Sequence, residues 1–165
     1  MTIQQIIKPA FLTTEHRHVH LKQTKITLIT ALIGIIALIY GAPWALYYWG
    51  LEGVTGQPAP PQVIATSEQQ QTLWEKSGCE GTPVLVELNP VSYLFSAATL
   101  DTPPPVMIFA WRIAAAYQRQ HQIRDGASWQ QLSGGALVIW ITRHWTVEQI
   151  LSRTIELDQA LVQSK

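Results

Sequence analysis

Residues 26–49 read ITLITALIGIIALIYGAPWALYYW, and no charged residue lies between Lys25 and Glu52. As an α-helix, the run from Ile26 to Tyr48 would be about 34 Å long, enough to cross a hydrocarbon layer of ~30 Å with some tilt. A core helix of a soluble protein is the alternative, but a chain of 165 residues is too small to cover such a helix on all sides. The stretch therefore predicts a single transmembrane helix over residues 26–49.

The charges on either side of this helix predict its direction. Before it lie four cations and one acid, Glu15, and the next cation after it is Lys76. The four cations are Lys8, Arg17, Lys22 and Lys25. Short basic flanks stay in the cytoplasm. We therefore expect residues 1–25 to form a short basic cytoplasmic arm at a bacterial inner membrane, with the C-terminal part in the periplasm.

Aromatic residues crowd the far end of the predicted helix. Amphipathic rings prefer the headgroup level, and lysines flank the near end. The residues predicted to lie at the membrane interface are therefore Lys22, Lys25, Tyr40, Trp44, Tyr47, Tyr48 and Trp49. Pro43 could kink or end the helix there. A cleaved signal peptide is the alternative, but its apolar region would be only about 7–15 residues long and would end in small residues. We predict an uncleaved membrane helix.

The composition after the helix limits the classes of partner. Residues 50–165 carry seven Lys or Arg against ten acids, a net charge of −3. Without a basic stripe, a nucleic-acid partner is not expected. The single cysteine, Cys79, cannot form an intramolecular disulfide, so the domain must be held together by packing, with Cys79 buried.

The remaining chain divides by composition. Residues 50–66 (GLEGVTGQPAPPQVIAT) are rich in Gly and Pro and predict an extended linker, followed by a small domain over residues 67–165. Pairs of the S/T-x-x-Q type predict helix starts at Ser67, Ser128 and Thr146. Further helices are expected over 91–100 and from the prolines at 103–105 to Gln122.

One segment has the composition of a strand. Pro83–Leu88 (PVLVEL) is β-branched, short and closed by Asn-Pro. Its partner could be Ala136–Thr142 or another chain, although Ala136–Thr142 itself favours a buried helix because no turn signal except two glycines precedes it. The predicted fold class is mainly α (α or α+β), with one N-terminal transmembrane helix and a small, predominantly helical extracytoplasmic domain.

No motif in the sequence indicates a catalytic, cofactor-binding or metal site. Cys79 with a histidine, His121 or His144, would be one catalytic possibility, and the pair Glu80 and Glu87 another. Each histidine lies close to arginines in the sequence. The alternating His16, His18 and His20 lack a Cys or carboxylate that would complete a ligand set. We expect no catalytic residue, cofactor or metal.

The predicted function is that of a single-pass, membrane-anchored accessory protein whose periplasmic domain docks onto an envelope assembly, such as secretion, conjugation, pilus or cell-wall machinery. Its expected partners are the lipid bilayer and another membrane or periplasmic protein. The alternative is a small periplasmic enzyme acting on the cell wall, either glycosidase-like or a Cys/His hydrolase. A fragment that begins near Thr66 is expected to be soluble, monomeric or weakly associating, and mainly helical.

Overall fold

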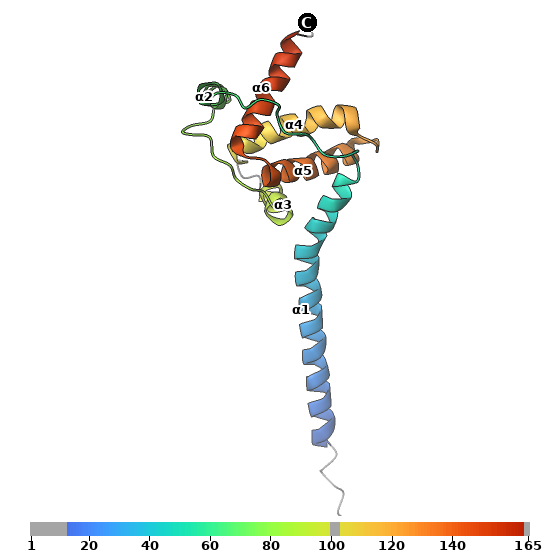
Figure 1. Cartoon of the computed structure of the whole chain (residues 1–165). Coiled ribbons are helices and arrows are strands. Elements are labelled where there is room, and N and C mark those ends of the chain that lie inside the picture. Colours follow the sequence, from blue (N-terminus) through green and yellow to red (C-terminus); the bar gives the residue numbers. More distant parts are fainter. Residues whose placement is uncertain (1–12, 100–102, 164–165) are drawn as a thin grey trace, which may run out of the picture. The chain divides into compact units, whose positions relative to one another are not determined.

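The computed structural model describes residues 13–99 and 103–163, and the side chains of 25–96 and 103–163 (Figure 1). These residues form six helices and no strand, so the prediction of a mainly helical chain is confirmed for them. The helices are α1 (Thr13–Leu51), α2 (Ser67–Lys76), α3 (Pro90–Thr99), α4 (Pro105–His121), α5 (Ala127–His144) and α6 (Val147–Gln163).

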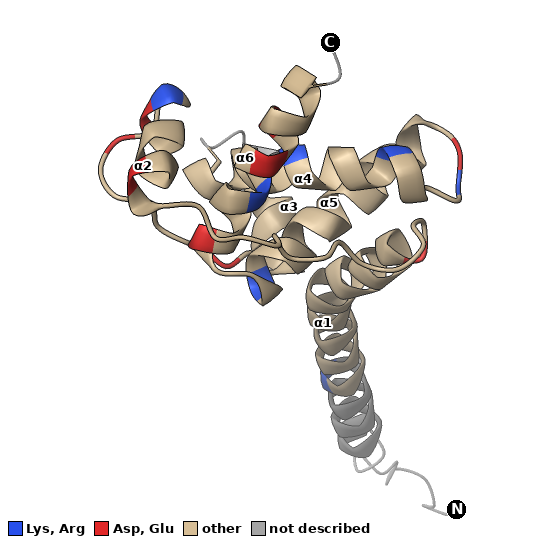
Figure 2. Cartoon of the chain, turned by 45° about the horizontal axis from the view of Figure 1, so that its top comes forward, with Lys and Arg blue, Asp and Glu red and all other residues tan. Residues whose placement is uncertain are grey.

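The chain divides into two compact units, Met1–Tyr40 and Gly41–Lys165, and α1 belongs to both. Lys25–Leu51 is the one described helical stretch that is long and apolar enough to cross a membrane, with a mean hydropathy of 2.2. Figure 2 shows α1 without charged residues beyond Lys25. Its leucines and isoleucines from Ile26 to Ile39 are exposed, as contact with lipid requires. Pro43 lies inside α1 and does not end it.

In the second unit, α5 is the central helix, and it is buried from Ser133 to Ile139. At Gly134 and Gly135, the two glycines that precede Ala136–Thr142, neighbouring helices approach α5 closely. A Cβ on Gly134 would lie 2.6 Å from the Trp111 ring of α4, and one on Gly135 would lie 3.0 Å from the Tyr93 hydroxyl of α3. Figure 1 shows α5 between α4 and α3. The glycines therefore allow close packing on two sides, and the prediction of a helix over Ala136–Thr142 is confirmed.

The core lies where α4, α5 and α6 pack together. It contains fully buried apolar side chains from all three helices, including Val106, Phe109, Leu137, Ile141, Ile150 and Leu151. Trp74 of α2 stacks on Phe109 with ring centroids 5.7 Å apart, which attaches α2 to this core. The predicted cap of α6 is confirmed, because Thr146 and Gln149 exchange two hydrogen bonds in a capping box.

The predicted linker lies against the helices of the second unit. Val54 is buried and forms a bridge with Gln122, and the N–H of Thr55 donates to the His121 carbonyl at 2.8 Å. Farther on, the N–H of Gln62 donates to Glu156 Oε1 at 3.0 Å, and that of Ala65 to Ser152 Oγ at 2.9 Å. We name residues 54–65 the strap. The compact unit thus begins at Gly41, ahead of the predicted domain start at residue 67.

The prediction of a strand over Pro83–Leu88 is wrong, since this segment has no regular secondary structure. Val84 and Val86 are exposed, whereas Leu88 is buried and its N–H donates to Thr142 Oγ1 of α5 at 3.3 Å. A lone strand needs a neighbour for its backbone groups. Its suggested partner, Ala136–Thr142, is helical, so no such neighbour exists among the described residues.

Two predicted caps are also corrected. The N-cap of α2 is Thr66, which forms a capping box with Gln69, and Gln70 instead donates from its buried amide to the Ala65 carbonyl at 2.8 Å. The N-cap of α5 is Gly126 (φ 108°) without a side-chain cap, so Ser128 lies inside the helix. Helices α3 and α4 match the expectations, although Asp101 and Thr102 lie outside the described residues.

Candidate functional site

The C-terminal end of α1 carries an aromatic cluster. Trp44 meets Tyr47 edge to face at 5.9 Å, and Tyr47 meets Tyr48 at 5.1 Å between ring centroids. Tyr47 is buried and Trp44 is partly buried against the core, whereas Tyr40, Tyr48 and Trp49 are exposed. The aromatic residues predicted to lie at the membrane interface thus form two groups, one packed against the core of the second unit and one exposed. Lys25 is exposed, and the Lys22 side chain lies outside the described residues.

The last turn of α5 adds a cation to this cluster. The Arg143 guanidinium carbon lies 5.5 Å from the centroid of the Trp44 ring, in a cation–π arrangement. A Cβ on Gly50 would lie 2.7 Å from that of Ala136, so the end of α1 runs antiparallel to α5. Sequence reasoning did not find Arg143, because 99 positions separate it from Trp44 and no local pattern links them.

The residues considered for catalysis each have local surroundings. Cys79 is buried, as expected, with its Sγ 3.9 Å from the Ser77 carbonyl of its own turn. Glu80 and Glu87 are exposed. His121 stacks on Tyr117 at 4.0 Å and His144 on Trp140 at 4.4 Å, each one turn earlier on its own helix.

The hydrogen bonds of both imidazoles are local. Nδ1 of His121 lies 3.1 Å from the Tyr117 carbonyl oxygen, and Nδ1 of His144 lies 2.7 Å from that of Trp140. Within the described part of the chain, neither ring bonds to a carboxylate, and no group of His, Cys, Asp and Glu side chains could hold a metal ion. The side chains of the N-terminal histidines lie outside that part.

An open groove of about 760 Å³ lies between α4, α6 and the start of the strap. Its apolar lining comes from both helices and from the strap, and includes Pro58, Ile113, Ala116, Leu157 and Leu161. We name it the α4–α6 groove. Sequence reasoning missed it, because its two walls are separated by more than 30 residues.

The charged lining of the α4–α6 groove is mostly basic. Arg112 forms an ion pair with Asp158 across the groove, and both side chains remain about 40% exposed. Arg112 is thus neither a purely solvated cation nor part of a buried pair. Arg153 pairs with Glu156 on α6 at 2.7 Å. Arg119 is exposed and has no ion pair with any described residue, which leaves its guanidinium available to a carboxylate.

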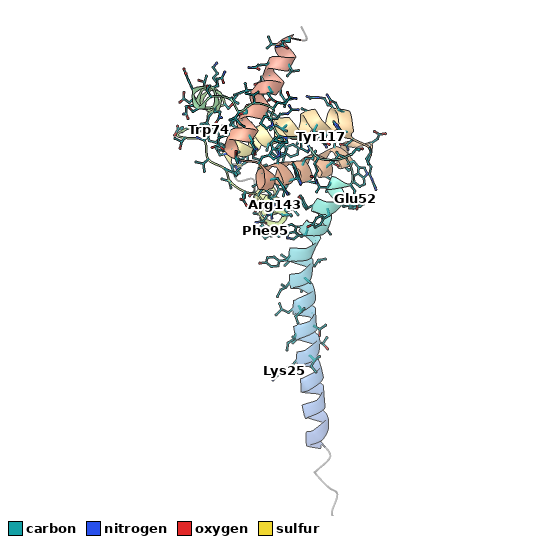
Figure 3. The ribbon with its side chains drawn as sticks, viewed as in Figure 1. Lys25, Glu52, Trp74, Phe95, Tyr117 and Arg143 are labelled. Atoms are coloured by element: carbon teal, nitrogen blue, oxygen red, sulfur yellow. The ribbon has the colours of Figure 1, made fainter. Side chains whose placement is uncertain are left out.

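Tyr117 connects the groove to the strap. Its hydroxyl donates to the Thr55 carbonyl at 2.7 Å, and desolvation raises the pKa of Tyr117 above its ordinary value of 10.0. The phenol therefore stays protonated at neutral pH and keeps this hydrogen bond. Figure 3 shows Tyr117 on α4, and the ring also supports the stacked His121. This uncharged hydrogen bond joins α4, one wall of the groove, to the strap.

In comparisons with known proteins, the chain matches no family model, and neither a curated protein nor a solved structure is similar to it.

Proposed function

We propose that this protein is a single-pass inner-membrane protein with its N-terminus in the cytoplasm, and that its periplasmic unit is an interaction module. In this proposal the α4–α6 groove binds a short segment of another envelope protein. The segment is apolar and carries at least one carboxylate. The observation that carries the proposal is the groove itself, an open hollow of about 760 Å³ whose lining is mainly apolar and includes three arginines.

The chemistry of the groove favours such a segment over a small polar substrate. Its lining includes aliphatic side chains such as Ala116 and Leu157, whose removal from water is favourable. Arg119 lines the groove, is exposed and has no ion pair among the described residues, and an arginine fork suits a carboxylate. Peptide segments that dock into apolar grooves use this combination of apolar contacts and a charged rim.

Anchoring by α1 also fits a binding role. A unit confined near a membrane meets membrane-bound partners at a raised effective concentration, so a weak contact in an open groove is sufficient. The groove is open, and its ion pairs are exposed and contribute little affinity by themselves. Binding through the groove is therefore expected to depend on the membrane helix as well as on Arg119.

The test is site-specific photocrosslinking in intact cells. A photoreactive residue at Ala116 is expected to give a discrete adduct with one envelope protein, and Arg119→Glu is expected to abolish that adduct. Arg124→Glu is the matched control, because Arg124 lies over the Trp129 ring at 4.3 Å and does not line the groove. An adduct that survives Arg119→Glu, or that is lost equally with Arg124→Glu, would refute binding through the groove.

A further inference from the structure

A second exposed apolar surface lies beside the outer end of α1. Helix α3 (PVSYLFSAAT) carries no charge, and Asp101 is the only charged residue between Glu87 and Arg112. Val91, Leu94 and Phe95 follow the i, i+3, i+4 spacing of one helical face. Leu94 is 40% exposed and Phe95 60% exposed, so this face is turned away from the core.

The position of α3 is set by contacts inside the second unit. Tyr93 packs against Gly135 of α5, and Tyr93 and Leu94 line an apolar hollow of about 360 Å³ together with Pro43, Leu46 and Tyr47 of α1. Those three α1 residues belong to the outer end of the candidate membrane span. Helix α3 therefore lies level with the part of α1 that is expected to cross the headgroup region.

Arg143 also lies beside the end of α1 that is expected to cross the headgroup region. It is exposed at the last turn of α5 and lies over the Trp44 ring, also in the outer end of the span. In the view of Figure 3, Phe95 and Arg143 both lie toward the lower side of this unit. An apolar helix face next to an arginine and an aromatic belt is the composition that the membrane interface favours, since rings and alkyl groups enter the acyl boundary while guanidinium binds phosphate.

We propose that Leu94 and Phe95 of α3, together with Arg143, form a second membrane contact that inserts into the headgroup layer of the bilayer spanned by α1. This contact fixes how the periplasmic unit is held at the membrane surface. Its occupant is lipid because the surface continues the aromatic end of the span and α3 itself, over Pro90–Thr99, bears no acidic residue. The inference requires α1 to span the membrane but does not use the α4–α6 groove, so the two proposals can fail separately.

The test measures depth in the full chain, in nanodiscs that contain phosphatidylethanolamine and phosphatidylglycerol and one copy of the protein each. A bimane label is placed at Phe95→Cys in a Cys79→Ser background, and at Val63→Cys on the strap as an exposed apolar control (72% exposed). Lipid carrying a nitroxide near its headgroup is expected to reduce the fluorescence at position 95 by about twofold or more, because the label lies in the interface. The label at position 63 should be unaffected.

Two results would overturn the proposal. One is equal accessibility of positions 95 and 63 to aqueous iodide, and the other is protection of position 95 from iodide without quenching by the nitroxide lipid, which would indicate a protein contact. If Phe95→Cys lowers the helix content by circular dichroism, Leu94→Cys is the substitute. Arg143→Gln should weaken the quenching at position 95 when the anionic lipid is present, whereas Arg124→Gln should not. Equal effects of the two arginine variants on the quenching would show that Arg143 is not part of the membrane contact.

Discussion

At the scale of single residues, close backbone approach decides how α1 meets α5. Gly50 is the clearest case, because a Cβ there would lie 2.7 Å from both the Ala136 Cβ and the Leu132 carbonyl oxygen. Backbone atoms of a buried helix cannot move aside at low cost. Glycine is therefore required at position 50 because any side chain there would overlap α5.

Gly50→Ala is predicted to destabilise the folded unit by about 1–3 kcal/mol, the usual cost of overpacking. Gly41→Ala is the matched control on the same helix, because a Cβ at Gly41 meets nothing within 4 Å. Thermal unfolding of the full chain in mild detergent, followed by tryptophan fluorescence, should show a midpoint lowered by several degrees for the first variant only. Equal midpoints for both variants would contradict the proposed close contact.

At the scale of helices and loops, local signals predicted most of the helices. The capping pair of Thr146 and Gln149 and the helical spacing after it are local features, and α6 follows them. The strand predicted at Pro83–Leu88 failed because β-branched residues favour a half-buried, pleated surface, and here no neighbouring strand provides one. A local sequence pattern does not reveal whether such a neighbour exists.

The strap and the α4–α6 groove could not be predicted for the same reason. The glycines and prolines before Thr66 do exclude regular structure, as expected of a linker. What holds these residues in place are contacts with distant side chains, such as Ser152 and Glu156, that accept from backbone N–H groups. Arg119 likewise has its candidate role only because α4 and α6 pack together. Contacts between residues that are far apart in the sequence leave no recognisable pattern in the spacing of residue types.

The start of α6 predicts a pH effect on stability. The hydrogen bond with Thr146 is the main cause that lowers the pKa of Glu148 below its ordinary value of 4.5, and a backbone hydrogen bond adds to it. A carboxyl whose pKa is lower in the folded state stabilises that state above its unfolded-state pKa, and this contribution disappears as the pH falls through the folded-state pKa. Glu148→Gln should therefore lower the unfolding midpoint at pH 7 and lose its effect once the pH falls below the folded-state pKa of Glu148.

The control for this prediction is Glu87→Gln, which removes one negative charge from an irregular, exposed segment. Thr146→Ala should cost about 1 kcal/mol through the lost cap. In that background, Glu148→Gln should have a smaller effect, because the two residues interact and their contributions are not additive. Full additivity of the two substitutions would contradict the coupling between Thr146 and Glu148.

At the scale of the whole molecule, the boundary of the compact unit changes the fragment that should fold. A fragment that begins at Thr66 lacks the end of α1 and the strap, and so exposes the surface of α5 around Ala136. A fragment that begins at Gly41 keeps the buried Tyr47 and Val54. We predict that Gly41–Lys165 unfolds cooperatively in mild detergent, whereas the shorter fragment has a markedly lower midpoint or aggregates. Equal midpoints, measured by far-ultraviolet circular dichroism, would show that the predicted boundary at residue 67 was sufficient.

The orientation of the chain in the membrane is the remaining prediction at this scale. Lys22 and Lys25 lie just before the uncharged run, whereas after it comes Glu52, and the next cation is Lys76. Because insertion retains short basic flanks in the cytoplasm, a C-terminal alkaline phosphatase fusion should be active and a C-terminal β-galactosidase fusion inactive.

Replacement of the four N-terminal cations by Gln, combined with three lysines added directly after Glu52, should reverse this pattern, since the bias in Lys and Arg sets the orientation. The same lysines added after Gln163 are the control, because charges that far from the helix have little influence on insertion. An unmodified chain with an active cytoplasmic reporter would refute the orientation. It would also exclude a periplasmic partner for the α4–α6 groove, while leaving the lipid contact of α3 to be tested in the opposite leaflet.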